Sequence, residues 1–398
     1  MFLANQLGAY RLALDPRDAE TLSVPAAEEV ERFLSYRENH VVTPLHALPA
    51  LARELGVGAI HVKDEGLRLG LGSFKALGGS YAVIRLVLDA ASERLGRAVD
   101  VAALQAPDVR AIAAGMTFAC ATDGNHGRSV AQGARLVGAS AVVFVHSGVS
   151  HERVAAIARF GAEIVRVAGS YDDSVEEAAR VADKNGWTIV SDTSWPGYER
   201  IPALVMQGYT AMVREALRQL AEPPTHVFVQ AGVGGVAAAV GGHLALALAD
   251  QRPMFIVVEP ARAACVYESA RVGRPVRIEQ GEPTVMAMLE CYEPSLIAWR
   301  VLSRVADGFM TVEEEDAVAA MKRLARPLGA DPAVVAGESG GVGLAGLIRA
   351  LADHETRKAL HLGSQSRIFV INTEGATDPQ RYAELVVQAQ GSGTTATT

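Results

Sequence analysis

The sequence predicts an α/β fold with two domains, each built on a mostly parallel sheet flanked by helices. The chain has 398 residues, which is more than one hydrophobic core ordinarily spans. Short apolar runs alternate along it with longer stretches of helical periodicity, and this alternation is typical of βαβ units. In such a fold the crossovers are right-handed, and functional groups gather at the carboxyl ends of the strands.

The strands are predicted at short, mainly apolar runs that fit a sheet buried on both faces. These runs are Ala59–Val62, Ala141–Val145, Glu163–Val167, Thr188–Ser191, His226–Gln230, Met254–Val258 and Ile368–Asn372. Helices are predicted over Ser73–Ala90, Arg128–Val137, Ser150–Phe160, Asp172–Asn185 and Ile201–Gln219. Ser150 is expected to be the N-cap of its helix, and Asp172 is given the same role in the next one. Because no low-complexity linker separates these elements, the two domains are expected to share an interface.

Composition and charge exclude several classes of function. A net charge of −8 gives no electrostatic reason to bind nucleic acid or acidic lipid. The three cysteines form no CxxC pair, so neither a disulfide framework nor a metal site is predicted, and a reducing compartment such as the cytoplasm fits. Whether Cys265 and Cys291 meet is left open. The N-terminal segment Met1–Glu20 lacks the basic and long apolar regions of a secretory signal.

One uncharged stretch, Phe228–Ala249, is long enough to span a bilayer. It contains Gln230, His243 and a glycine cluster, so a buried strand, a glycine turn and a buried helix explain it better. The chain is therefore expected to be soluble.

Lys75 is the first candidate functional residue, in the run Gly72-Ser73-Phe74-Lys75 at a predicted helix start. A lysine is unfavourable there unless a negative charge compensates for the helix dipole. Ser73 is a possible N-cap. The apolar neighbours Phe74 and Tyr81 are expected to lower the pKa of the Lys75 amine, as a Schiff-base lysine requires. Taken alone, Lys75 fits a solvated surface lysine better, so its assignment depends on the other motifs.

A glycine-rich turn follows the predicted strand that ends at Gln230. Gly232, Val233, Gly234 and Gly235 lead into an apolar helix, and backbone N–H groups at such a helix start can bind a phosphate. The spacing matches neither a dinucleotide fingerprint nor a P-loop. Tight backbone packing at a turn is an equally good explanation of this motif by itself.

Three polar loops lie next to apolar runs and complete the set of candidates. Asp123 and Asn125 lie in the loop after Met116–Ala121, where turn and helix-cap roles compete with a proton-transfer role for Asp123 and a cofactor contact for Asn125. Asp192 follows the strand predicted at Thr188–Ser191, where an N-cap or Asx turn is the alternative. Thr373 follows the last predicted strand, and a hydroxyl there would leave a cofactor ring nitrogen unprotonated.

Together, these motifs resemble the fold-type II enzymes that depend on pyridoxal 5′-phosphate (PLP). Among these enzymes, the chain looks more like the 2,3-diaminopropionate ammonia-lyase family, and this resemblance covers the chain from Ser73 to Pro379. It is carried by SFKALGGSYAV, ATDGNHGRSVA, SDTSWPGYERIPALVMQGYTAM, QAGVGGVAAAV, GESGGVGLAGL and INTEGATDP, which occur in the family's order.

The resemblance implies α,β-elimination from D- and L-2,3-diaminopropionate to pyruvate and ammonia, by a homodimeric enzyme. Lys75 would form the Schiff base with PLP, Asp123 would serve as base for the L isomer and Asp192 for the D isomer. A pocket with poor water access is expected to raise the pKa of either carboxyl. One carboxylate cannot reach both faces of a planar substrate adduct.

The resemblance also implies the cofactor contacts and the domain boundaries. Phe74 and Asn125 would contact the pyridine ring, the turn Gly232–Gly235 would bind the phosphate, and Thr373 would face the ring nitrogen, with Thr377 as second choice. Residues 1–77 and 196–398 would form a large PLP-binding domain, and 78–195 a small mobile one that closes over the substrate.

The chain also departs from the family pattern. Met288 and Tyr292 stand where glycines are expected, and Gly72 stands where a polar residue is usual. These departures leave the identity of the substrate open. A serine, threonine or 3-hydroxyaspartate dehydratase on the same scaffold is the nearest alternative. A nucleotide-binding oxidoreductase that uses Gly232–Gly235, or a non-catalytic binding relative, would be the alternative from another class.

Overall fold

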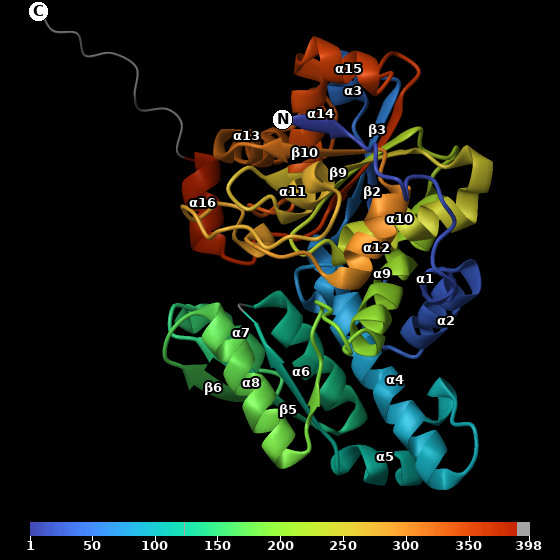
Figure 1. Cartoon of the computed structure of the whole chain (residues 1–398), viewed down its shortest axis with the longest axis vertical. Helices are drawn as coiled ribbons and strands as arrows, with labels where there is room; N and C mark the ends of the chain where they lie inside the picture. The colour runs from blue at the N-terminus through green and yellow to red at the C-terminus, as the bar shows by residue number, and fades with distance from the viewer. Residues whose placement is uncertain (123, 388–398) are drawn as a thin grey trace, which may run out of the picture.

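Two mostly parallel sheets with helices around them form the molecule (Figure 1). The structure is a computed structural model that describes residues 1–122 and 124–387. The seven-stranded sheet has, in spatial order, β1 (Phe2–Ala4), β10 (Gly308–Val312), β9 (Met254–Pro260), β8 (His226–Gln230), β11 (Arg367–Asn372), β3 (Ala59–Asp64) and β2 (Leu45–Ala47). The four-stranded sheet has the order β6 (Glu163–Val167), β5 (Ser140–His146), β4 (Thr117–Ala121) and β7 (Thr188–Ile189).

Neighbouring strands are parallel except at the two edges of the larger sheet. There β1 pairs antiparallel with β10, and β2 pairs antiparallel with β3. Parallel pairing requires crossover connections, and the helices between the strands supply them. The predicted α/β fold with two mostly parallel sheets is therefore confirmed.

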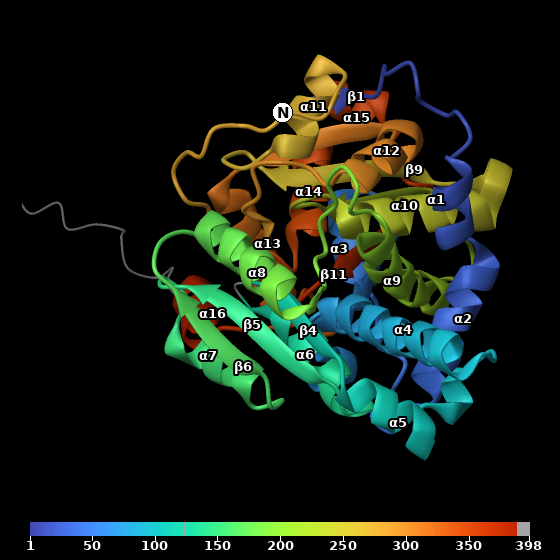
Figure 2. The ribbon, with the colours of Figure 1, turned by 60° about the horizontal axis from the view of Figure 1, so that its bottom comes forward.

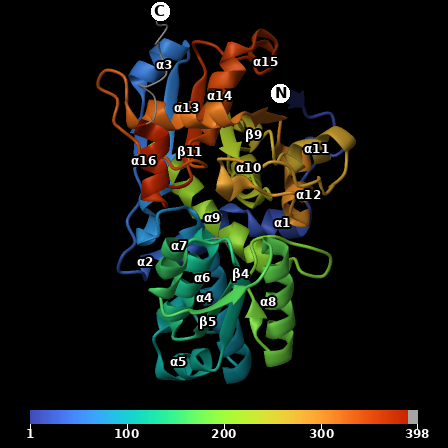
Figure 3. The same cartoon turned by 90° about the vertical axis from the view of Figure 1, so that its left-hand side faces the viewer.

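Helices cover the sheets and connect the two halves of the molecule (Figure 2). They are α1 (Pro16–Thr21), α2 (Val24–Ser35), α3 (Pro49–Leu55), α4 (Lys75–Leu95), α5 (Pro107–Ala114), α6 (Asn125–Val137), α7 (His151–Ala158), α8 (Tyr171–Asn185), α9 (Arg200–Gln219), α10 (Gly235–Leu248), α11 (Cys265–Val272), α12 (Leu296–Val305), α13 (Glu314–Ala325), α14 (Val342–Ala352), α15 (His354–Ala359) and α16 (Pro379–Val387). The side view places α4, α5, α6 and α8 beside the four-stranded sheet and most remaining helices around the larger one (Figure 3).

The seven predicted strands are all present, most of them at the predicted bounds or extended by one or two residues. The sequence analysis missed β1, β2, β4 and β10. Two of these, β1 and β2, are three-residue edge strands, and their apolar patterns are too short to stand out. Val190 and Ser191 were predicted as the end of the strand at Thr188–Ser191, but β7 ends at Ile189.

Helix starts were predicted with mixed success. Ser150 caps α7 as expected, because its side chain accepts a hydrogen bond from the Arg153 N–H. The cap predicted at Asp172 is wrong, because Ser170 caps α8 in a reciprocal capping box with Asp173. The uncharged Phe228–Ala249 stretch folds as predicted into β8, a glycine turn and α10. In the described part of the chain, no helix is long and apolar enough to span a membrane.

A buried ion network fixes the segment between β3 and α4. Arg68, which is 0% exposed, donates from Nε to Glu65 Oε2 at 2.7 Å and from Nη2 to Glu215 Oε2 at 2.6 Å. Lys63 Nζ lies 3.0 Å from the same Glu215 oxygen. Thr43 Oγ1 donates to Glu65 and accepts from Arg68. Two cations and two carboxylates thus compensate one another in the core, immediately before the helix that carries Lys75.

Candidate functional site

Lys75 is the first residue of α4, and its ammonium contacts the Asp192 carboxylate. Asp192 follows β7 at the carboxyl end of the four-stranded sheet, where a parallel sheet places functional groups. Both side chains are largely covered, at 23% and 19% exposure. The structure therefore brings together two of the three predicted catalytic residues. Asp123, the third, lies outside the described residues.

The contact decides the charge of both groups. Burial alone would lower the pKa of Lys75, but the charge of Asp192 outweighs it and raises that pKa. Burial alone would raise the pKa of Asp192, but the charges of Lys75 and His126 lower it well below its usual range. The prediction of a lowered pKa for Lys75 is wrong, as is that of a raised one for Asp192, because an opposite charge lies against each group.

The glycine turn lies beside Asp192. A Cβ atom at Gly235, the first residue of α10, would be 3.6 Å from the Asp192 carbonyl oxygen. Gly234 has a φ of 93°, a left-handed conformation that favours glycine. The N–H of Ser295 donates to the Val233 carbonyl at 2.9 Å and ties the turn to the start of α12. The first N–H groups of a helix have no partner within it, so those of α10 are available to bind an anion.

The predicted ring contacts are joined through Glu374 and its neighbours. Asn125 begins α6, is buried, and donates from Nδ2 to Glu374 Oε2 at 2.8 Å. The Phe74 N–H donates to the Thr373 carbonyl at 3.0 Å, and the Lys75 ammonium lies 5.8 Å from the centroid of the Phe74 ring. Thr373 Oγ1 accepts from the Gln230 side chain at 2.9 Å. Phe74, Asn125 and Thr373 thus belong to the same site as Lys75.

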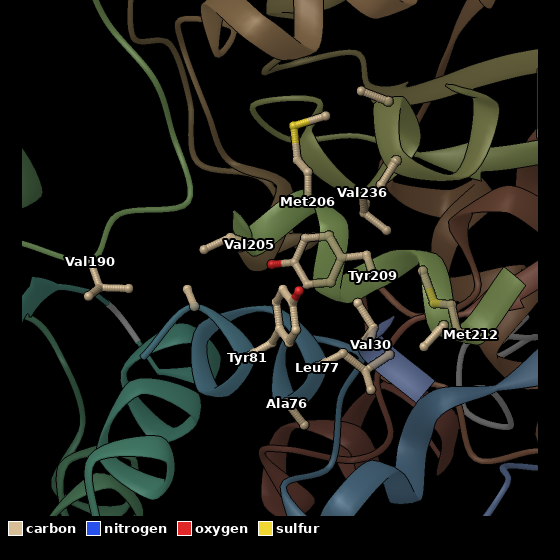
Figure 4. Packing of buried hydrophobic residues seen from close by; sticks show 14 of the residues in the cluster. Val30, Ala76, Leu77, Tyr81, Val190, Val205, Met206, Tyr209, Met212 and Val236 are labelled. Atoms are coloured by element: carbon tan, nitrogen blue, oxygen red, sulfur yellow. The ribbon is translucent and has the colours of Figure 1, made fainter. Parts of the chain in front are cut away.

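Helix α9 holds α4 in place at this point. The Tyr209 ring packs edge-on against Phe74, with centroids 4.8 Å apart. Figure 4 shows Tyr209 and Val205 of α9 beside Leu77 of α4. A Cβ atom at Gly78 would lie 2.5 Å from Tyr209 Cε1, so only glycine permits this crossing. The Tyr209 hydroxyl is buried and has no hydrogen-bond partner among the described residues.

The residues present fit a cofactor that carries an aldehyde and a phosphate. Lys75 supplies an amine, and the Gly232–Gly235 turn supplies backbone donors. The Ser73 hydroxyl, two residues before Lys75, is buried and has no partner in the described chain. The predicted N-cap role of Ser73 is wrong, because the residue pairs in extended conformation with Glu374 and Phe74 occupies the cap position. A buried polar atom without a protein partner is typical of a ligand contact.

The sequence analysis missed several residues that the fold brings to this site. Glu374 and Glu338 were inside recognised motifs but had no role. His126, buried beside Asn125, donates from Nε2 to the Val190 carbonyl at 2.8 Å. Tyr209 was hidden in an apolar helix, where its polar hydroxyl between small residues was the only signal.

The unusual residues Met288 and Tyr292 lie in a segment that closes over the glycine turn. The Met288 N–H donates to the Ser339 hydroxyl at 3.2 Å, and Tyr292 donates to Glu290 at 2.7 Å. A Cβ atom at Gly232 would be 2.9 Å from Cys291 Sγ. The segment is therefore a wall of the candidate site. Among the described residues, Cys120, Cys265 and Cys291 form no disulfide bond.

Comparisons with known proteins agree with this geometry. The family model "Pyridoxal-phosphate dependent enzyme" matches residues 36–374. The diaminopropionate ammonia-lyase of Escherichia coli (strain K12) is 41% identical over 352 residues, which are 86% of this chain and 87% of that protein. The biosynthetic threonine dehydratase of Haemophilus influenzae is more distant, at 28% over 315 residues, 77% of this chain and 52% of its own.

Solved structures of the Escherichia coli diaminopropionate ammonia-lyase superpose on most of the chain. The complex with an aminoacrylate–PLP azomethine reaction intermediate gives a TM-score of 0.85 at 36% identity, over 97% of this chain and 96% of that one. The complex with D-serine gives the same TM-score and coverage at 35% identity.

Proposed function

Because the chain belongs to the pyridoxal-phosphate-dependent enzymes, within the diaminopropionate ammonia-lyase family, we propose that it converts D- and L-2,3-diaminopropionate to pyruvate and ammonia. The resemblance, the enzyme class and the PLP cofactor predicted from the sequence are confirmed. The nucleotide-binding oxidoreductase and the non-catalytic relative are no longer needed as explanations, and the dehydratases are more distant relatives.

The observation that carries the proposal is the contact of the Lys75 ammonium with the Asp192 carboxylate beside the glycine turn. PLP, when bound, supplies the electron sink that allows a Cα–H bond of an amino acid to break. Lys75 would hold it through Nζ, and backbone N–H groups of Gly232–Gly235 would bind its phosphate. Phe74, Asn125 and Thr373 would face its ring.

In this proposal the protein's own groups move the protons. Asp192 lies against Lys75 Nζ, and its carboxylate would take the α-proton of the D isomer. Asp123 would take the α-proton of the L isomer from the other face. The β-amino group leaves in its protonated form, takes the bonding electrons and becomes neutral ammonia, and hydrolysis of the remaining three-carbon unit releases pyruvate and the second ammonia.

Domain movement and assembly belong to the same proposal. Residues 78–195 would form a small mobile domain that closes on the rest, 1–77 and 196–398, although its first boundary falls within α4. We also propose a cytoplasmic location, which the sparse cysteines favour, and a homodimer, which rests on the family resemblance. Light scattering after size-exclusion chromatography tests the dimer, and a monomer would contradict it.

A spectrum of the purified protein, before and after addition of diaminopropionate, tests the central proposal. Bound PLP absorbs near the violet edge, and the substrate should change that absorbance while pyruvate accumulates. Lys75→Ala should abolish both. A panel of β-substituted amino acids should give pyruvate fastest from diaminopropionate, and turnover of serine or threonine alone would favour a dehydratase.

Asp192→Asn tests the assignment of the two bases. It should reduce turnover of the D isomer more than that of the L isomer, because Asp123 would still serve the other face. Equal losses on the two isomers would refute this division of roles.

A further inference from the structure

The Asn125 side chain is held at both ends. Its Nδ2 donates to Glu374 Oε2 at 2.8 Å, and its Oδ1 accepts from Arg128, one turn further along α6. Asn125 is 5% exposed, so water does not compete for these bonds. An asparagine amide that is free to rotate by 180° presents either its oxygen or its nitrogen to a ligand. Here Arg128 holds the amide oxygen and Glu374 holds the amide nitrogen, so the orientation of the Asn125 amide is fixed.

Glu374 reaches Asn125 from the seven-stranded sheet. It follows β11 and pairs through its backbone with Ser73, two residues before Lys75. The side chain is 2% exposed, and Oε1 has no hydrogen-bond partner in the described chain. The contact therefore joins α6 directly to the segment that positions Lys75.

A second carboxyl lies behind Glu374. Glu338 is 3% exposed, its Oε2 also lacks a partner among the described residues, and Arg153 of α7 lies 3.9 Å from its Oε1. A Cβ atom at Gly337 would be 3.2 Å from Glu374 Cγ, which shows how closely the two segments pack. Two buried carboxyls with one free oxygen each cannot both ionise without cost.

The charged groups around the pair set its protonation. Burial, and then the charge of Glu338, raises the pKa of Glu374 to about 7, against smaller opposing effects of Asn125 and Arg153. Burial also raises the pKa of Glu338, and Arg153 opposes this. Arg128 faces Glu374 from α6.

We propose that Glu374 is a positioning residue that, with Arg128, orients the Asn125 amide so that an N–H faces the cofactor ring, while Glu338 tunes the charge of Glu374. The inference rests on the proposed function, in which Asn125 contacts that ring. Nδ2 has two hydrogens. One bonds to Glu374, and the other remains to bond the oxygen atom attached to the pyridine ring of PLP. Without Glu374 the amide can turn its own oxygen toward that oxygen, which is repulsive.

The rate at which PLP leaves the holoenzyme tests whether Glu374 acts through Asn125. Glu374→Ala and Asn125→Ala should each accelerate the loss roughly tenfold, which corresponds to about 1.4 kcal/mol. The double variant should be no faster than either single one, because both remove the same bond. Glu374→Gln should stay within roughly threefold of the parent, since its amide oxygen also accepts from Nδ2. Additive single effects, or an unchanged rate in Glu374→Ala, would overturn the proposal.

A pH titration of the holoenzyme's absorbance tests the role of Glu338. The parent should show a spectral transition with a midpoint near pH 7, because ionisation of Glu374 places a charge near the ring. Glu374→Gln should remove the transition, and Glu338→Gln should move it to lower pH by removing the neighbouring negative charge. Glu54→Gln is the matched control, since Glu54 pairs with Arg323 on the surface, and it should leave the midpoint unchanged.

The possible results separate the two proposals. A parent protein that binds no PLP refutes the proposed function. A parent that binds PLP and consumes diaminopropionate, but keeps its spectral midpoint in Glu374→Gln, overturns only the role of Glu374.

Discussion

Removing Glu215 should destabilise the protein strongly. Its carboxylate accepts from Arg68 Nη1 at 2.8 Å and from Nη2 at 2.6 Å, and it lies 3.0 Å from Lys63 Nζ. In Glu215→Ala, only Glu65 remains in this network to balance the charges of Lys63 and Arg68. One positive charge in the core is then uncompensated.

The magnitude follows from the burial of these groups. Removing one partner of a buried ion pair destabilises a protein by about 3–5 kcal/mol. Arg68 and Lys63 are both 0% exposed and both lose a partner, so we expect about 4–5 kcal/mol. That is a large fraction of the roughly 5–15 kcal/mol that stabilises a typical protein.

The loss should also depend on pH in a defined direction. Burial lowers the pKa of Lys63, against the charges of Glu215 and Glu65. A lysine with a lowered folded-state pKa destabilises the fold as pH falls through that pKa. Without Glu215, the folded-state pKa of Lys63 is lowered further. The unfolding free energy lost in Glu215→Ala should therefore be smaller at pH 9 than at pH 6, by on the order of 1 kcal/mol.

Urea unfolding of the holoenzyme at the two pH values measures both effects. Glu31→Ala is the matched control, because Glu31 pairs with Arg214 and Arg218 of α9 in a more exposed setting and should lose at most about 1 kcal/mol. A loss in Glu215→Ala no larger than that of the control would refute the assignment of a charge-compensating role.

Three further outcomes are expected. Ser73→Ala should leave the melting temperature within about 1 °C, since its hydroxyl has no partner in the described chain, yet it should release PLP faster; a large stability loss would show an unrecognised structural role. Gly234→Ala should lose PLP retention and roughly 1–3 kcal/mol of stability, because its φ is 93° and the new Cβ atom would lie 3.2 Å from Ala298 Cβ; wild-type retention would contradict the phosphate-binding assignment. Glu374→Gln should reduce the loss of unfolding free energy between pH 5 and pH 8. A carboxyl whose pKa is about 7 in the folded state stabilises the fold at pH values below its unfolded-state pKa, and this stabilisation is lost as pH rises through the folded-state pKa. Parallel plots of unfolding free energy against pH for the two proteins would count against a protonated Glu374.

The sequence predicted those parts of the fold that local pattern determines. The β8 strand, the glycine turn and α10 were recoverable because an uncharged run, three glycines and a second apolar run are adjacent in the chain. The charge states of Lys75 and Asp192 were not, because they depend on a partner 117 residues away. The apolar neighbours of Lys75 in sequence predicted a lowered pKa, whereas its neighbour in space is a carboxylate.

The same reason explains the residues that sequence analysis missed. Asn125 and Glu374 are separated by 249 residues, and no local pattern pairs them. Glu374 was visible as an acidic residue after a buried strand, a position where a parallel sheet places functional groups. An Asx or cap role competes at every such position, as the choice between Ser170 and Asp172 shows.

The contact between Lys75 and Asp192 also affects how the newly folded chain reacts with aldehydes. Only an uncharged amine attacks a carbonyl group, and Asp192 holds the Lys75 amine in its charged form. An aldehyde without a phosphate gains nothing at the Gly232–Gly235 turn that could offset the loss of this ion pair. We therefore expect the chain to react more slowly with aldehydes that lack a phosphate than with PLP, whose phosphate would bind at this turn.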